Sequence, residues 1–302
     1  MKYDIRQLRL LSNEAIAKGI YDMRLAYGEN EIPVQCGQFA HVYVPGKSLR
    51  RPISVCDARD GVLRLVYQVK GEGTKIMSQM KQGEQVDVLV PLGNGFCVDK
   101  EKKYALIGGG IGVPPMLYTA AQCKEPLAIT GFRSRELVIL QEDFAQAGAE
   151  VALVTDDGSA GKKGFVTDVL RERIAEVDEV CACGPTPMLE AVARVCAEFG
   201  KPCQISLEER MACGIGACLV CAVKVRKNGE EIMQHVCKNG PVFNAEEVVF
   251  HGGFIGKGSG RQLCESADRR LGNLRVRQGV RRVLSALEAG RHLLQGHHPE
   301  TA

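Results

Sequence analysis

The sequence predicts a multidomain β and α/β fold: an antiparallel β-barrel, a doubly wound parallel α/β sheet and a small C-terminal module rich in cysteine. Residues 1–98 carry short β-rich stretches, "AHVYVP", "LRLVYQVK" and "EQVDVLVPLG", which Gly and Pro interrupt. Residues 99–200 alternate short apolar runs, such as "YALIGGG" and "EVALVTDD", with helical stretches such as "MLEAVARVCAEFG". That alternation is typical of a parallel sheet covered by helices. Residues 201–250 are compact and rich in Cys and Gly.

Local patterns refine this division. In the first region, "TKIMSQMKQG" favours one short helix, so we expect a closed barrel with a helical lid. In the third region, "CAVKVRKNGEEIMQHVC" predicts a β-hairpin that turns at Asn228 and Gly229, because Asn-Gly is preferred in two-residue hairpin turns. We therefore assign residues 1–98 to the barrel, 99–200 to the α/β domain and 201–250 to the cysteine-rich module.

Composition excludes several functional classes. The chain has 302 residues, of which 45% are hydrophobic and 25% charged, and its net charge of +3 argues against a general nucleic-acid binder. The sequence contains no run of about 18 apolar residues, so we expect no segment that spans a membrane. The start, "MKYDIRQLRLLSNEA", lacks the apolar core of a signal peptide, so we expect a cytoplasmic protein. In a reducing compartment, thirteen cysteines point to metal or redox chemistry rather than to disulfides.

Residues 251–302 differ in composition from the rest of the chain. They hold eight arginines and one lysine against four acidic residues, and they open with "HGGFIGKGSG", which is typical of a flexible linker. One stretch, "VRRVLSALEAGRHLL", favours at most an isolated, marginal helix. Because too few apolar residues follow the linker to form a core, we expect a basic tail that is disordered or marginally helical. A chain that ends at Phe250 is predicted to keep its cofactors.

Three cysteines, Cys213, Cys218 and Cys221, gather in "MACGIGACLVC" with the spacing C-x4-C-x2-C. Followed by a distant fourth cysteine, this is the plant-type spacing of [2Fe–2S] ligands. Structural zinc sites usually show two separated C-x2-C pairs, so zinc is the lesser alternative. Cys237 is the favoured fourth ligand, because the hairpin would fold it back towards Cys221. The weaker candidates for this position are Cys203 and His235.

A glycine-rich turn opens the α/β region. In "YALIGGGIGVPPM" a strand ends in Gly108, Gly110 and Gly112, and a helix follows at Pro115. Glycines at such a turn allow a dinucleotide pyrophosphate to approach the backbone and the N-terminus of the helix. The turn is therefore a candidate NAD site.

A second strand end in the same region adds to this candidate site. The stretch "CACGPTPM" carries Cys183, Gly184 and Pro185 at the place where such sheets hold the nicotinamide. Cys183 is either a small residue at the end of a strand or a thiol on the nicotinamide side. It is the one candidate for a direct role in catalysis that the sequence offers.

A nicotinamide delivers two electrons as hydride, whereas an iron–sulfur cluster accepts one, and flavin chemistry connects the two. Flavin barrels of the ferredoxin-reductase type use a motif Arg-x-Tyr-Ser, in which the arginine pairs with pyrophosphate and the serine bonds the isoalloxazine edge. In "RRPISV", Arg51 and Ser54 fit this motif, whereas Ile53 replaces the tyrosine and removes a stacking ring. In "GEGT", Gly73 and Thr74 would offer a helix N-terminus to the second phosphate.

In this order the motifs resemble those of the electron-transfer subunit of type B, NAD-dependent dihydroorotate dehydrogenase, in the ferredoxin-reductase-like superfamily. "RRPISV", "GGGIGVPPM", "CACGPTPML", "MACGIGACLVCAVKV" and "VCKNGPVFNAEEVVF" look like signatures of that family. The resemblance implies FAD, a [2Fe–2S] cluster and NAD as cofactors. It also implies a partner, the FMN-containing catalytic subunit, in a heterotetramer of two of each chain that serves de novo pyrimidine (UMP) biosynthesis.

The same resemblance assigns site residues. The cluster ligands would be Cys213, Cys218, Cys221 and Cys237. The residues in contact with FAD would be Arg51, Pro52, Ile53, Ser54, Val66, Tyr67, Gln68, Gly73 and Thr74. The choice between NAD and NADP is left open by the residues after "PLAITGF", which are Arg133, Arg135 and Glu136, and the resemblance favours NAD.

The resemblance also implies a direction for the electrons, which would pass singly from the partner's FMN through the cluster to FAD before hydride leaves to NAD+. No acid–base pair or nucleophilic triad is needed, and the sequence indicates none. One alternative is the small subunit of a bifurcating NADH-dependent ferredoxin–NADP reductase, or of the related sulfide dehydrogenase, which shares this architecture. Another is a non-catalytic iron–sulfur redox sensor, although the flavin and nicotinamide motifs count against it.

Overall fold

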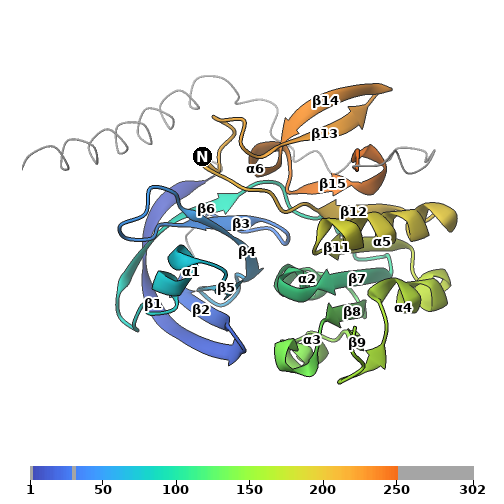
Figure 1. Ribbon diagram of the computed structural model, residues 1–302, viewed down its shortest axis with the longest axis horizontal. Helices are drawn as coiled ribbons and strands as arrows, with labels where there is room; N and C mark the ends of the chain where they lie inside the picture. Colours follow the sequence, from blue (N-terminus) through green and yellow to red (C-terminus); the bar gives the residue numbers. More distant parts are fainter. Residues whose placement is uncertain (1–2, 29–31, 251–302) are drawn as a thin grey trace, which may run out of the picture. The chain divides into compact units, whose positions relative to one another are not determined.

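A computed structural model describes residues 3–28 and 32–250 of the chain (Figure 1). The predictions made for residues 251–302 lie outside the described residues. No helix within the described ranges is long and apolar enough to cross a membrane. The described chain forms a barrel, then a sheet with helices, and then a hairpin-bearing segment that returns to the sheet.

Six antiparallel strands close into a barrel in the order β1-β2-β5-β4-β3-β6. The strands are β1 (Asp4–Ala17), β2 (Ile20–Ala26), β3 (Phe39–Val42), β4 (Arg51–Asp57), β5 (Val62–Gln68) and β6 (Gln85–Leu92). The period-2 alternation of strands is clear in β5, where Leu63 and Leu65 are buried in the core and Arg64 is not. The stretch expected to be helical, residues 74–83, is helical only at its start, because α1 (Glu72–Met77) begins two residues earlier and ends at the buried Met77. The predicted antiparallel barrel is confirmed.

A seven-stranded sheet follows, in the order β10-β9-β8-β7-β11-β12-β15. Its strands are β7 (Tyr104–Gly109), β8 (Leu127–Phe132), β9 (Glu150–Thr155), β10 (Lys162–Lys163), β11 (Glu179–Cys183), β12 (Cys203–Ser206) and β15 (Val242–Asn244). Its α-helices are α2 (Val113–Ala120), α3 (Gln141–Gln146), α4 (Val166–Arg173) and α5 (Thr186–Glu198). In Figure 1, α2 and α3 lie on one side of the sheet and α4 and α5 on the other. The predicted doubly wound parallel sheet is confirmed, with β15 added antiparallel at its edge.

The cysteine-rich segment lies between two neighbouring strands of this sheet. After β12 the chain forms the loop with the three clustered cysteines, the hairpin β13 (Ala222–Lys227) and β14 (Glu230–His235), and the short helix α6 (Val236–Asn239). It then returns as β15 beside β12. Asn228 and Gly229 have φ of +53° and +85°, so the hairpin turns where the sequence predicts. The sheet thus continues beyond residue 200. The short 3-10 turns are η1 (Gly110–Gly112), η2 (Arg135–Leu137), η3 (Ile174–Glu176) and η4 (Ala245–Glu247).

The cysteine-rich segment shares its apolar core with the rest of the protein. One continuous cluster of buried side chains contains Phe39 and Leu92 from the barrel, Ile205 from the sheet, and Cys221 and Val236 from the segment itself. Asn94, directly after β6, donates side-chain hydrogen bonds to the backbone oxygens of residues 238 and 239. The barrel and the sheet therefore supply the apolar surface on which the segment packs, which we call the floor of the segment.

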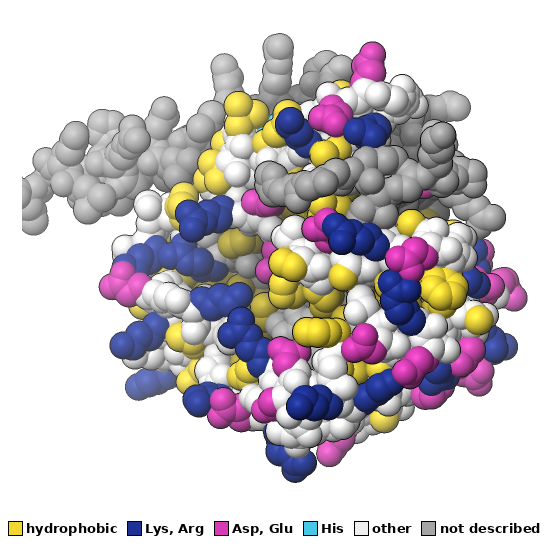
Figure 2. All heavy atoms as spheres, turned by 45° about the vertical axis from the view of Figure 1, so that its right-hand side comes forward, with side chains coloured by type: hydrophobic (Ala, Val, Ile, Leu, Met, Phe, Trp, Pro, Cys, Tyr) yellow, Lys and Arg dark blue, Asp and Glu magenta, His cyan; other side chains and the backbone are white. Residues whose placement is uncertain are grey.

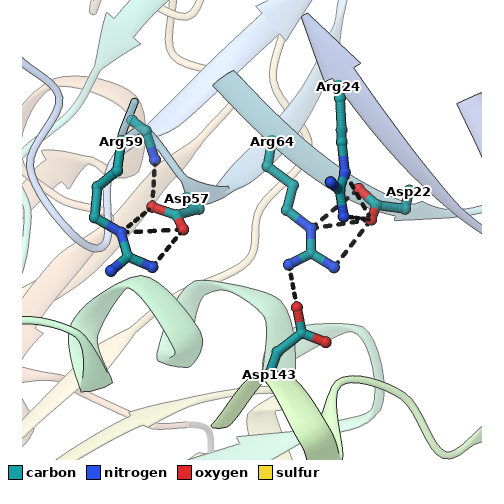
Figure 3. Close-up of polar contacts among 7 residues, drawn as sticks. Asp22, Arg24, Asp57, Arg59, Arg64 and Asp143 are labelled. Carbon is teal, nitrogen blue, oxygen red and sulfur yellow. Dashed lines mark hydrogen bonds and ion pairs between the residues drawn. The ribbon is translucent and has the colours of Figure 1, made fainter. Parts of the chain in front are cut away.

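A network of charged side chains joins the barrel to the helical layer of the sheet (Figure 3). Arg64 of β5 contacts Asp22 of β2, with 2.9 Å between Nη2 and Oδ2, and its Nη1 contacts the carboxylate of Asp143 in α3. Arg24 lies 3.3 Å from the same Asp22 carboxylate. Only 13% of the Arg64 side chain and 6% of the Asp22 side chain are exposed. This network couples the barrel to α3.

Candidate redox site at the edge of the sheet and the barrel

Two predicted motifs meet at the topological switch point of the sheet. From β7 the chain adds β8 and β9 on one side and later places β11 on the other side. Ligands of doubly wound sheets bind at such a point, outside the carboxyl ends of the strands. The glycine turn follows β7 and the Cys-Gly-Pro turn follows β11. The fold therefore brings both candidate NAD motifs to one edge.

Close packing explains the glycines of the first turn. A Cβ atom on Gly108 would lie 2.6 Å from Cα of Val113, and one on Gly112 would lie 2.6 Å from the carbonyl carbon of Cys183. Gly110 has φ of +54°, a conformation that favours glycine. The turn after β7 thus packs backbone against backbone with the end of β11. Pro115 continues the turn as a buried residue of α2.

A cavity of about 910 Å³ lies at this edge and also reaches the barrel. Gly110 and Pro185 line it from the two turns, while Gln68 and Lys70 line it from the barrel. Its volume is within the usual range of pockets for small molecules and cofactors. Figure 2 shows apolar side chains in a hollow of the surface, with lysine and arginine side chains gathered along one side of it. Because Gln68 is a predicted FAD residue, the candidate NAD and FAD sites adjoin.

Several predicted NAD residues lie behind the lining of the cavity rather than on it. Gly184 packs against Met188, and Cys183 is buried with 1% of its surface exposed. Burial raises the pKa of Cys183 to about 12, and the carboxylate of Glu208 adds to this shift. Cys183 is therefore a neutral thiol at pH 7. Its assignment as a nicotinamide-side thiol stays a prediction.

The cavity contains acidic side chains that sequence reasoning missed. Glu208, two residues beyond β12, and Asp156, directly after β9, both line it. Their sequence signal was their position after strand ends at the ligand-binding edge. Arg133 lines the same cavity and Arg135 does not; the Arg135 guanidinium is bound to the carbonyl oxygen of Ser159. One of the two arginines that left the NADP question open is thus engaged elsewhere.

The predicted flavin motif lies on β4 beside the start of α1. A Cβ atom on Gly73 would lie 2.5 Å from Nη2 of Arg51, so this glycine allows the guanidinium to lie against the first turn of the helix. The Thr74 hydroxyl accepts hydrogen bonds from the backbone N–H groups of Lys70 and Gly71, at 3.0 and 3.2 Å. It therefore stabilises the helix start. A guanidinium beside the first turn of a helix is suited to a diphosphate.

The remaining flavin candidates differ in accessibility. Pro52, Ile53 and Ser54 are half-buried, so their side chains can meet a ligand. On β5, Val66 and Tyr67 are buried, and the Tyr67 hydroxyl donates to Oδ1 of Asn13 at 3.0 Å. Only their backbone groups are therefore available to FAD, whereas Gln68 lines the cavity.

The four predicted cluster ligands come together as two pairs. Sγ of Cys218 lies 3.4 Å from Sγ of Cys213, and the side chain of Cys237 lies beside that of Cys221. Backbone N–H groups point at these sulfurs: that of Ala217 at Cys213, and that of Gly216 at Cys237, both at 3.2 Å. Val236 donates its N–H to the carbonyl of Cys221, which fixes the hairpin return.

This paired arrangement bears on the kind of metal centre. Within residues 3–28 and 32–250, no three Cys, His, Asp or Glu side chains converge tightly enough to hold one metal ion. A tetrahedral zinc needs all four ligands at a single centre, whereas a [2Fe–2S] centre has four thiolate ligands for two irons. Two pairs of cysteines, with N–H groups aimed at their sulfurs, fit the second case. Of the weaker ligand candidates, Cys203 lies in β12 beside Cys196 and belongs to neither of the two cysteine pairs.

The backbone of the loop favours the thiolate form at one of these positions. Burial opposes ionisation of Cys213, but the N–H groups of Ile215, Cys218 and Ala217 outweigh it and lower the pKa of the thiol. At Cys237, burial and the adjacent Cys221 raise the pKa. Binding of a metal would allow Cys221 and Cys237 to be thiolates side by side, because the positive charge of the metal stabilises both.

A histidine that sequence reasoning missed lies under the loop. His41 of β3 is fully buried, and neither Nδ1 nor Nε2 has a hydrogen-bond partner. Burial lowers its pKa to about 4, and Arg50 and Arg51 add to the shift. In the sequence, "FAHV" gave no signal beyond a short strand, because only the fold shows what lies above the ring.

Comparisons with known proteins agree with this geometry. The family model for the iron–sulfur cluster binding domain of dihydroorotate dehydrogenase B matches residues 208–249. The dihydroorotate dehydrogenase B (NAD(+)) electron transfer subunit of Caldanaerobacter subterraneus subsp. tengcongensis is 45% identical over 244 residues, which cover 80% of this chain and 97% of that protein. The corresponding subunit of Streptococcus mutans is 41% identical over 255 residues, with coverage of 80% and 97%.

Solved structures show the same architecture. A structure of the NADH-dependent reduced ferredoxin–NADP oxidoreductase, studied for flavin-based electron bifurcation, is similar with a TM-score of 0.72 and 30% identity. The similarity covers 81% of this chain and 90% of that one. The ferredoxin reductase of carbazole 1,9a-dioxygenase, at a TM-score of 0.56 and 20% identity, covers 65% of this chain and 67% of its own, and shares the fold.

Proposed function

The chain belongs to the family of electron transfer subunits of dihydroorotate dehydrogenase B, and from this we propose that it conducts electrons from a dihydroorotate-oxidising catalytic subunit to NAD+. The proposed route runs through a [2Fe–2S] cluster on Cys213, Cys218, Cys221 and Cys237 and through FAD on the barrel. The observation that carries the proposal is the arrangement of these four cysteines in two pairs, with backbone N–H groups aimed at the sulfurs of Cys213 and Cys237.

The residues of the chain have distinct tasks in this route. Arg51, held against the first turn of α1 by the space at Gly73, binds the FAD diphosphate. The turns after β7 and β11 bind NAD+ at the cavity, where Gln68 supplies a wall from the barrel side. Bound flavin exchanges either one or two electrons, so it links the cluster to hydride transfer.

Hydride transfer requires that the two adjoining sites exclude water and fix the relative orientation of the rings. The cavity is lined mainly by apolar side chains and glycine backbone, such as Ile111, Phe132 and Val166. One of its acidic side chains, Glu208 just beyond β12, provides a hydrogen-bond acceptor suited to the carboxamide of the nicotinamide. Cys183, neutral behind the lining, leaves the charge of the site unchanged.

The partner proposed here is the catalytic subunit of the same enzyme. Relatives named as electron transfer subunits imply a second chain on which dihydroorotate is oxidised. We propose that this chain carries FMN and that two copies of each chain form a heterotetramer. The site assignments to FAD, NAD and cluster, and the functional division of the chain at residues 98, 200 and 250, belong to the same proposal, although β12 and β15 extend the sheet past residue 200.

Metal analysis tests the proposal directly. Protein purified without oxygen is expected to contain about two irons and two labile sulfides per chain, the content of a [2Fe–2S] cluster. Cys218→Ser should lose the cluster but keep FAD, because Cys218 lies in the cysteine loop and Arg51 in the barrel. Cys196→Ser, at a buried cysteine of α5 outside the loop, is the matched control and should keep both. Stoichiometric zinc in the anaerobic wild type would refute the cluster assignment.

A second candidate is favoured by one specific observation, the 30% identity to the NADH-dependent reduced ferredoxin–NADP oxidoreductase chain. The two functions differ in their partners and nucleotides. An electron transfer subunit of dihydroorotate dehydrogenase should support NAD+ reduction by dihydroorotate when its catalytic subunit is present. If the reconstituted chain instead reduces ferredoxin only in the presence of NADPH, the second candidate replaces the first.

A further inference from the structure

Strand β3 is a wall common to the flavin motif and the cysteine loop. Along one edge it pairs with β4, where Phe39 lies opposite Ser54 and His41 opposite Pro52. Successive side chains of a strand point to opposite faces. Ala40 is buried within the barrel core, whereas Phe39 belongs to the apolar cluster that includes Cys221 and Cys237.

His41 therefore points out of the barrel, on the side of the cysteine loop. It follows Phe39 at a spacing of two residues, and their rings meet edge to face with 6.4 Å between centroids. Above it lies Gly214, the residue next to Cys213. A Cβ atom on Gly214 would come within 2.6 Å of Nδ1 of His41 and 3.3 Å of Cδ1 of Leu92. The imidazole thus packs directly against the backbone of the loop.

The ring of His41 has no hydrogen-bond partner within the described chain. It is fully buried, and both ring nitrogens are unpaired. Arg50, directly before β4, donates to the backbone oxygen of His41 and to the carboxylate of Asp87 rather than contacting the ring nitrogens. A buried polar group without a partner loses its hydrogen bonds to water and gains nothing in exchange. Such a group calls for an acceptor that the polypeptide itself does not supply.

The surroundings of the ring restrict what that acceptor can be. An uncharged imidazole carries one N–H donor. Of the ring atoms, Nδ1 comes nearest to a Cβ placed on Gly214, which follows Cys213 in the loop that would supply three of the four cluster thiolates. Backbone N–H groups of Gly216 and Ala217 already point at sulfurs of Cys237 and Cys213. The imidazole would add a side-chain donor from β3 to these backbone donors.

We propose that His41 is a positioning residue for the redox centre, which donates a ring N–H hydrogen bond to a sulfur of the [2Fe–2S] cluster and thereby raises its reduction potential. The inference rests on the proposed function, because it requires the cluster. Reduction adds negative charge to the cluster, and hydrogen bonds to its sulfurs stabilise that charge. Because β3 pairs with β4, which carries the flavin motif, His41 would tune the reduction potential of the cluster that exchanges electrons with FAD.

The test uses the holoprotein with its catalytic partner, purified without oxygen. His41→Leu removes the donor and keeps an apolar side chain, whereas His41→Gln keeps an N–H donor. Leu92→Val is the matched packing control, because Leu92 touches the same glycine of the loop without a polar group. The cluster midpoint is measured by EPR-monitored titration and the FAD midpoint by absorbance, together with iron and sulfide content.

The expected result is a lower cluster midpoint in His41→Leu, a smaller decrease in His41→Gln, and the wild-type value in Leu92→Val. The FAD midpoint should stay the same in all three. A cluster midpoint unchanged in His41→Leu would overturn the inference, as would a shift confined to FAD. If wild-type protein contains zinc, the proposed function fails together with the inference; iron and sulfide without a midpoint shift refute the inference alone.

A second measurement covers the case in which His41→Leu does not retain the cluster. Wild-type protein labelled with ¹⁵N-histidine should show a nitrogen hyperfine coupling in pulsed EPR of the reduced cluster. The coupling should vanish in labelled His41→Gln, where the donor belongs to an unlabelled side chain. A spectrum without this coupling in the wild type, or one that persists in the variant, would show that His41 does not bond the cluster.

Discussion

Replacement of Arg64 by Met is expected to weaken the junction between the barrel and the α/β layer. Arg64 contacts the buried carboxylate of Asp22 and also that of Asp143 (Figure 3). Loss of one partner from a buried pair costs about 3–5 kcal/mol, because an uncompensated charge stays behind. Here Arg24 remains 3.3 Å from Asp22, and the Asp143 side chain is 33% exposed. Both reduce the penalty, so we expect about 2–3 kcal/mol.

Circular dichroism during heating measures this effect. For a protein of this size, 1 kcal/mol shifts Tm by about 2–4 °C, so Arg64→Met should melt about 5–10 °C below the wild type. Because the cavity has walls from both the barrel and the sheet, KM for NADH should also rise while the FAD content is kept.

The neighbouring Asp57–Arg59 pair supplies the control for this experiment (Figure 3). Arg59 bonds Asp57 two residues away on the same chain segment, and 48% of its side chain is exposed. The Asp57 side chain is 18% exposed, but its carboxylate still accepts a hydrogen bond from the N–H of Ala58, so loss of the more exposed arginine should cost about 1 kcal/mol. Arg59→Met should therefore melt within about 3 °C of the wild type. Equal melting temperatures for the two variants would refute the reasoning, because the difference in burial would then have no energetic consequence.

Two further substitutions test the nucleotide sites. In Gly112→Ala the new methyl group would lie 2.6 Å from the carbonyl carbon of Cys183 and 2.7 Å from Cα of Gly184. Overpacking of about 1–3 kcal/mol should raise KM for NADH about tenfold in steady-state assays with an artificial acceptor. An unchanged KM would contradict the assignment of the NAD site. In Gly73→Val the new side chain displaces the Arg51 guanidinium. Loss of one charge-assisted hydrogen bond should weaken FAD binding about tenfold to a hundredfold, measured by fluorescence titration of the apoprotein. Wild-type affinity would show that Arg51 does not bind FAD.

Local patterns in the sequence predicted much of the fold and of the candidate site. The spacing of Cys213, Cys218 and Cys221 predicted that they gather, because a short glycine-rich loop cannot hold them far apart. Asn228 and Gly229 predicted the hairpin turn, since both adopt the positive φ that such a turn requires. In each case the interaction that decides the structure lies within a few residues along the chain.

Contacts between distant segments could not be predicted in this way. Arg64 and Asp143 meet only after the barrel and α3 have packed. The three-residue strand β15 is too short to give a pattern, and its pairing with β12 depends on the whole intervening segment. His41 reads as part of an ordinary short strand, and its unpaired ring becomes visible only when Gly214 is placed above it.

The shared floor beneath the cysteine loop has a consequence for maturation of the protein in the cell. Phe39 and Leu92 leave the ribosome long before Cys213, and domains generally fold in the order of synthesis. Cys237 comes near Cys221 only through the hairpin, and β15 closes the segment after it. Iron and sulfide therefore have to be delivered to a chain that is already almost complete, with its barrel folded. A chain that has not yet received them would hold four metal-free cysteines on a scaffold that is already folded.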